Sequence, residues 1–328
     1  MRLHRASHRL AAAAAVSALV LTVSACGDDD DSAGSTNITP TDSAGGSVSG
    51  SVAGSGSGSA SGAFEDQATG APLTPEEQTA VEGYRNYITA QVADSVTVTE
   101  ELVEAVKADD ITKAKTLYAK SRIGWESIEP VAAAFGDLDP RVDLREADVE
   151  DGDTWTGWHV LEKALWEDKD LEGMDEIGDT LLDDLDELTE SVKTVEITPT
   201  AMAMGAKELL DEVASGKITG EEEAFSHTDL VDFKANLDGA RKVFDLLKPI
   251  AERNDADLVK TLETEFDDVD MALEKYEKGD SYVSYDTVTE SERKALTDVV
   301  NALGEPLSKL AGAIQSDSDN SASPSSTS

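Results

Sequence analysis

Apolar residues recur at helical spacing along most of the chain between residues 73 and 315. Side chains three or four positions apart share one face of a helix, whereas a strand needs alternating apolar and polar positions. Thr74-Pro75-Glu76-Glu77 is a capping box with proline at the first helical position, and it marks the first helix start. The pattern predicts helices at about 75–107, 111–135, 155–166, 174–193, 199–214, 229–252, 255–278 and 288–315.

Strand signals are few in this region. Val96–Val98 and Tyr282–Tyr285 are short and have no evident partners. An aspartate-rich segment at about 136–153 and a stretch at about 217–228 are predicted as non-helical connections. The fold class is therefore all-α, and about eight helices in residues 73–315 favour two four-helix-bundle lobes.

The first 25 residues have the features of a targeting segment. Arginines at the start are followed by an apolar run from Leu10 to Val23, which is too short for an ordinary membrane span. Val23-Ser24-Ala25-Cys26 resembles a bacterial lipobox, which implies cleavage of residues 1–25 and lipid attachment to Cys26. The alternative is a plain secretory signal with an incidental cysteine. Cys26 is the only cysteine, so an intrachain disulfide is impossible.

Residues 26–72 are predicted to be a disordered tether, because the Ser/Gly/Asp-rich tract has almost nothing large to bury. As a flexible coil it would reach roughly 35–40 Å from the lipid. Residues 316–328 are again rich in serine and are predicted to be a disordered tail. The expected location is the outer face of the cell membrane, at the cell surface or in the periplasm, with the lipid as the only membrane contact.

The formal net charge of −41 argues against binding to nucleic acid and against electrostatic binding to anionic lipid or acidic polysaccharide. The charge suits a cation binder. Solubility in a salty or acidic exterior explains most of it equally well, so charge alone is weak support for a metal.

The segment around His159 and Glu162 is the most informative part of the chain. On a helix at 155–166 these two residues share a stripe roughly 100° wide with Trp155, Trp158 and Trp166. A carboxylate buried on such a face without a partner would cost several kcal/mol. A metal ion is one compensating partner, and a hydrogen-bonded histidine–glutamate pair is the other.

Further acidic candidates lie at the edges of apolar patterns. Glu126 and Glu129 border the apolar stripe of the 111–135 helix, either as ligands or as groups that are solvated or paired with Arg122. Asp143 lies between two apolar residues in a loop that lacks the EF-hand pattern, and it is the aspartate of that loop expected to point inward. Glu222 is a candidate in the 221–223 glutamate run, where the register is ambiguous.

The histidine inventory limits the chemistry. His4 and His8 leave with the signal, so only His159 and His227 remain, and His227 is equally well explained as a hydrogen-bonded residue near a helix start. A three-histidine zinc site is impossible and no His-Glu-x-x-His motif occurs. Carboxylates with one or two imidazoles suit iron, manganese or, less selectively, copper and zinc.

The chain resembles the imelysin-like family, specifically the EfeO/EfeM branch of bacterial iron-uptake proteins, over its whole folded region. The resemblance rests on residues 125–132, on 135–140 with 143–146, on 157–163, which contain Trp158-His159-Val160-Leu161-Glu162, and on 226–233. It implies two four-helix bundles and a metal site with His159 and Glu162 as its His-x-x-Glu motif. Glu126, Glu129, Asp143 and Glu222 are the further ligands that it implies.

The resemblance also implies a function and partners. The expected role is to bind ferrous or ferric iron and deliver it to a permease of the EfeU type, with a haem peroxidase of the EfeB type as a second partner. Where longer relatives carry a cupredoxin-like domain, this chain has only its tether. Two alternatives stay open: a metallopeptidase of the imelysin type, and a surface ligand-binding protein without metal.

Overall fold

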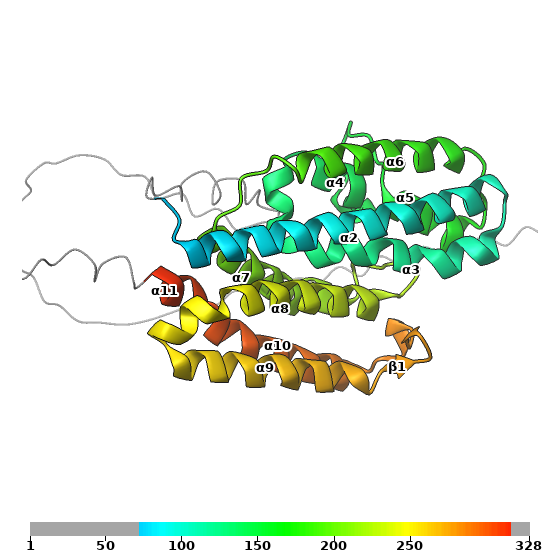
Figure 1. The fold of residues 1–328 in the computed structure, drawn as a ribbon. Helices are drawn as coiled ribbons and strands as arrows, with labels where there is room; N and C mark the ends of the chain where they lie inside the picture. The colour runs from blue at the N-terminus through cyan, green and yellow to red at the C-terminus, as the bar shows by residue number, and fades with distance from the viewer. Residues whose placement is uncertain (1–71, 316–328) are drawn as a thin grey trace, which may run out of the picture. The chain divides into compact units, whose positions relative to one another are not determined.

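The computed structural model describes residues 72–315 (Figure 1). The predicted signal peptide, the lipid site at Cys26, the tether up to residue 71 and the tail at 316–328 lie outside the described residues.

Three long helices with two short ones form the first part of the fold, drawn in cyan and green in Figure 1. The long helix α2 packs against both α3 and α6, and it begins with the predicted capping box at Thr74. The short helices α4 and α5 pack on α6 and complete this group. Their bounds are α2 Pro75–Lys107, α3 Ile111–Ile128, α4 Leu138–Asp143, α5 Trp158–Lys163 and α6 Met174–Ser191.

Four long helices, the short helix α11 and a small hairpin form the second part of the fold. The helix α8 packs against α7 and α9, and α10 closes the group against α7 and α9. Because α8 also packs against α2 and α3, one continuous apolar core joins both parts. The bounds are α7 Pro199–Ser215, α8 Asp229–Asn254, α9 Ala256–Glu274, α10 Glu290–Leu307 and α11 Leu310–Gln315, with a small hairpin of β1 Glu277–Lys278 and β2 Ser281–Tyr282.

The all-α prediction is confirmed, while several element boundaries differ. The predicted 111–135 helix tightens into the 3-10 turn η1 (Glu129–Phe135), because Pro130 lacks the N–H that a regular helix needs. The aspartate-rich segment, predicted as non-helical, contains α4 and the 3-10 turn η2 (Glu146–Asp148). The strand signal at Tyr282 does have a partner, Glu277.

The helix predicted at 155–166 begins only at Trp158. Gly157 precedes it with φ +88°, and a Cβ there would lie 2.1 Å from the carbonyl oxygen of Val142. Only glycine permits this contact between the start of α5 and the end of α4. The close approach sets His159 beside Asp143.

A second close backbone contact joins α3 to α8. A Cβ on Gly239 would lie 2.2 Å from the carbonyl oxygen of Ser127, so the two helices meet where one of them has no side chain. Asn236 lies three residues before Gly239, and Glu126 directly precedes Ser127. This contact therefore brings Asn236 of α8 within hydrogen-bond reach of Glu126.

Candidate metal centre

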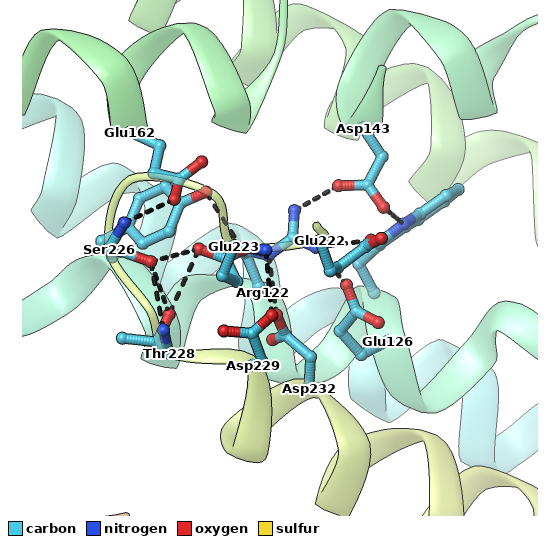
Figure 2. A network of polar contacts seen from close by, with 12 residues as sticks. Arg122, Glu126, Asp143, Glu162, Glu222, Glu223, Ser226, Thr228, Asp229 and Asp232 are labelled. Atoms are coloured by element: carbon cyan, nitrogen blue, oxygen red, sulfur yellow. Dashed lines mark hydrogen bonds and ion pairs between the residues drawn. The ribbon is translucent and has the colours of Figure 1, made fainter. Parts of the chain in front are cut away.

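The six predicted ligands come together where the two groups of helices meet. Helix α3 and η1 supply Glu126 and Glu129, α4 supplies Asp143, and α5 supplies His159 and Glu162. Glu222 comes from the connection between α7 and α8, far along the chain (Figure 2). Glu129 is the most accessible of the six, with a side chain 13% exposed. The site is therefore internal to the fold.

The guanidinium of Arg122 lies at the centre of the cluster. Arg122 is one helical turn before Glu126 and pairs with it through Nη2, while Nη1 pairs with Asp143. Its Nε faces Glu223 at 2.7 Å and Asp232 at 3.6 Å, as Figure 2 shows. The expected alternative in which Glu126 pairs with Arg122 is thus observed.

Lys217 is a second buried cation. It begins the 3-10 turn η4 (Lys217–Thr219), and its Nζ lies 2.9 Å from Glu126 Oε2 and 2.9 Å from both oxygens of Glu129. Glu222 Oε1 is 3.4 Å away. Asn236 donates its Nδ2 hydrogens to Glu126 and Glu129, at 2.9 and 2.7 Å. Each of these buried carboxylates therefore has a polar partner.

His159 connects the two sides of the site. Its Nδ1 lies 3.0 Å from Glu162 Oε2, and its Nε2 lies 3.4 Å from Asp143 Oδ1 without a hydrogen-bond partner. Burial and the charge of Arg122 lower the pKa of His159, but Asp143 and Glu162 outweigh them and raise it to about 10. A metal ion at Nε2 therefore has to displace a proton. Trp125 fixes Asp143 by donating from Nε1 to Oδ2 at 2.8 Å.

Glu162 accepts hydrogen bonds with both of its oxygens. Oε1 accepts from the backbone N–H groups of Phe225 and Ser226, at 2.9 and 2.7 Å, and Oε2 accepts from His159. Burial alone would raise the pKa of Glu162, but the bonds from His159, Ser226 and Phe225 lower it. Glu162 is thus an ionised acceptor that links α5 to the connection between α7 and α8.

Carboxyl groups outnumber basic groups in the cluster. Burial raises the pKa of Glu223 to about 8, with Glu162 adding to the effect, and it raises the pKa of Asp229 to about 7. Burial and the neighbouring Glu126 also raise the pKa of Asp232, and both oxygens of Asp232 lack a hydrogen-bond partner. Some of these groups therefore keep protons at neutral pH, which an added cation would release.

Two sets of side chains in residues 72–315 bring at least three potential ligand atoms within 4.8 Å of one another. One consists of Asp143, His159 and Glu222, and the other of Glu126, Glu129 and Asp143. They share Asp143, so they form one continuous oxygen-rich site with a single imidazole. Such a donor set suits iron, manganese, zinc or copper.

A family model described as Imelysin matches residues 80–310, which is most of the chain. The chain belongs to the imelysin family. It is 48% identical over 238 residues to an "Efem/EfeO family lipoprotein" of Staphylococcus haemolyticus, an alignment that covers 71% of this chain and 83% of that protein. A protein of Staphylococcus aureus with the same name is 46% identical over 241 residues, covering 72% and 85%.

These comparisons confirm the imelysin-like, EfeO/EfeM-type resemblance that the sequence motifs predicted. Both relatives are named as lipoproteins of the Efem/EfeO family. In the part of this imelysin that the structure describes, no helix has the length and apolar character required to cross a bilayer.

The structure selects one residue from the ambiguous glutamate run. Glu221 is exposed, whereas Glu222 is buried and faces Arg122, Lys217 and Arg145. Glu223 points to the other side of Arg122 and accepts from Tyr118. Glu222 is thus the member of the run that lies in a potential metal-binding set.

His227, the other remaining histidine, lies outside both sets. Its backbone adopts φ +58°, and its carbonyl accepts from the N–H of Tyr285. Thr228 is the N-cap residue of α8 without a side-chain capping bond, because its hydroxyl donates to Glu223 instead. Ser226 also donates its hydroxyl hydrogen to Glu223.

Sequence reasoning missed several residues of the site. Asp229, Asp232 and Asn236 are spaced by three and four residues on the buried face of α8, and a polar stripe inside an apolar face was the signal for them. Lys217 carried no such signal, because it lies in a short connection.

Proposed function

We propose that this chain is a lipid-anchored binding protein that captures iron and delivers it to a membrane permease. The names of the relatives support the association with iron uptake. Delivery to a permease of the EfeU type, with a haem peroxidase of the EfeB type as a second partner, is the finer part of the proposal. Lipid on Cys26 and a tether up to residue 72 would hold the domain at the outer face of the membrane.

One observation carries the proposal. The Nε2 atom of His159 is buried without a hydrogen-bond partner, and it faces Asp143 in a set that also contains Glu222. Glu126 and Glu129 approach Asp143 from the other side. One nitrogen with several carboxylate oxygens is a hard-to-borderline donor set, which suits ferrous or ferric iron. Glu162, the remaining predicted ligand, contacts Nδ1 on the other side of the His159 ring.

The charges around the site make binding dependent on protons. An arriving iron ion would compete with the proton on His159 and with those held by Glu223 and Asp229. Iron binding should therefore release protons, and its affinity should fall as the pH is lowered.

A binding role is favoured over a metallopeptidase. A hydrolytic metal centre needs an open coordination position and a free general base. Here Glu126 and Glu129 are held by Lys217 and Asn236, and Asp143 by Arg122 and Trp125. These three carboxylates are therefore already engaged and are not free to act as a general base. Metal-dependent cleavage of a peptide library, lost in His159→Ala, would contradict the proposal.

Iron titration tests the binding step directly. The chain from residue 26 onward, with Cys26→Ser to prevent lipid attachment, is titrated with Fe²⁺ under anaerobic conditions in a calorimeter. Glu222→Gln should weaken binding at least tenfold, because a carboxylate ligand is lost, whereas the exposed neighbour substitution Glu221→Gln should not. If the unsubstituted chain binds no iron, the proposed function is wrong. Delivery is tested by cellular uptake of radioactive iron with and without His159→Ala.

A further inference from the structure

Glu162 differs from the other predicted ligands in what its oxygens already do. Its side chain is fully buried, and three donors occupy it: two backbone N–H groups at Oε1 and the His159 ring at Oε2. A carboxylate offers about four lone-pair positions, so little of this acceptor capacity remains for an ion. Neither of the two potential metal-binding sets in residues 72–315 includes Glu162.

The orientation of His159 follows from this contact. A carboxylate that accepts from Nδ1–H fixes the ring and leaves Nε2 as the nitrogen available to a metal ion. Here Nε2 points away from Glu162 toward Asp143, 3.4 Å away. The Glu162 carboxylate therefore lies behind the ring, on the side opposite the potential ligands Asp143 and Glu222.

The same carboxylate also anchors the chain segment that carries Glu222. The N–H groups of Phe225 and Ser226 both point to Glu162 Oε1, as Figure 2 shows for Ser226. Glu222 is three residues before Phe225 in the same connection between α7 and α8. Glu162 thus sets the position of two groups of the site, the imidazole from one side and Glu222 through the backbone.

We propose that Glu162 is a positioning residue that orients His159 and anchors the 221–228 connection, and that it does not itself bind the ion. The proposal rests on the metal-binding function proposed above. It separates the His-x-x-Glu motif into one ligand and one support. The two backbone amides occupy Oε1, so only the second lone pair of Oε2 remains for an ion.

Spectroscopy of a bound probe ion separates support from coordination. Cu²⁺ is added to the chain from residue 26 with Cys26→Ser, and its electron paramagnetic resonance spectrum is recorded at saturation. In Glu162→Gln the side-chain amide would donate to Nδ1 and force the ring proton onto Nε2, so the Kd should rise about 10–100-fold. The saturated spectrum should keep the copper hyperfine splitting and the single nitrogen coupling. His159→Gln should abolish the nitrogen coupling, and Glu146→Gln, at an exposed glutamate paired with Lys163 of α5, should change nothing.

A changed hyperfine splitting in saturated Glu162→Gln would show that an oxygen ligand has been lost, and it would overturn the proposal. An unchanged Kd would overturn it as well. Failure of the unsubstituted chain to bind either Cu²⁺ or Fe²⁺ would instead refute the proposed function, and the ligand assignment with it.

Hydrogen exchange tests the anchoring without any metal. In the metal-free protein the amide protons of Phe225 and Ser226 should be protected, and they should remain so in Glu162→Gln, whose side-chain oxygen still accepts. In Glu162→Ala both should exchange at least tenfold faster, while amides in the middle of α8 keep their rates and show that the variant is folded. Unchanged exchange of Phe225 and Ser226 in Glu162→Ala would refute the anchoring role.

Discussion

Replacing Arg122 by methionine should destabilise the metal-free protein more than any comparable change of a surface arginine. The side chain is fully buried and pairs with Asp143, Glu126 and Glu223, with further acidic groups at 3.6 Å. Methionine fills much of the same volume but leaves these carboxylates without their cation. Removing one partner of a buried ion pair costs about 3–5 kcal/mol. For a domain of this size that corresponds to a fall in Tm of roughly 6–20 °C.

Arg241→Met is the matched control. Arg241 also has two acidic partners, Asp267 at 3.0 Å and Asp270 at 2.8 Å, but its side chain is 24% exposed and solvent screens the pairs. Its loss should cost less than about 1 kcal/mol. Both variants are unfolded in urea with EDTA present and followed by circular dichroism, and the midpoint and the m-value are compared.

Arg122→Met should lower the free energy of unfolding, and the pH dependence of this deficit identifies its cause. At pH 5 the carboxyl groups around Arg122 can take up protons, so the deficit of Arg122→Met should be clearly smaller than at pH 7.5. A deficit at pH 7.5 no larger than that of Arg241→Met would refute the reasoning. A large deficit that does not change between the two pH values would show that lost packing, rather than uncompensated charge, is responsible.

Three further outcomes are expected. The metal-free protein should lose stability as the pH rises from 5 to 8, and urea midpoints at several pH values will show this. In the folded state the pKa values of Glu223 and Asp229 are raised to about 8 and about 7. The stabilisation from these two groups is therefore complete below the unfolded pKa near 4 and is lost as the pH rises through their folded pKa values. Lys217→Met should destabilise the protein by about 3 kcal/mol at pH 7.5 in urea titrations, because three glutamates lose their ammonium partner. Gly239→Ala should lower both Tm and Fe²⁺ affinity, because its Cβ would lie 2.2 Å from a carbonyl oxygen of α3, whereas Gly312→Ala, with no atom within 4 Å, should leave both unchanged or slightly improved.

The helices could be predicted because burial follows local spacing along the chain. The stretch from Pro75 to Lys107 illustrates this, since its cap and its apolar stripe are both local signals. The late start of α5 could not be predicted in the same way. It depends on the contact between Gly157 and the carbonyl of Val142, which belongs to a different helix, so the local spacing of apolar residues does not reveal it.

Some residues of the candidate site could likewise be predicted from local sequence signals, and others could not. The placement of His159 and Glu126 among apolar positions, together with the family motifs, was enough to select them. The pairing of Lys217 with Glu126 spans 91 residues, and no local pattern encodes it. The register of Glu221–Glu223 was also out of reach, because the connection is not a regular helix and periodicity does not assign a face to each residue.

The irregular connection at 221–228 has a kinetic consequence. The two groups of helices are held together by α8 packing on α2 and α3, which does not involve this segment. The connection itself is held by polar contacts: the hydrogen bonds from Phe225 and Ser226 to Glu162, and the ion pairs of Glu222 and Glu223 with Arg122 and Lys217. It can therefore open while the helices stay packed. The residence time of an ion beside Glu222 would then be set by this local opening, and its release rate should depend far less on urea than the rate of global unfolding.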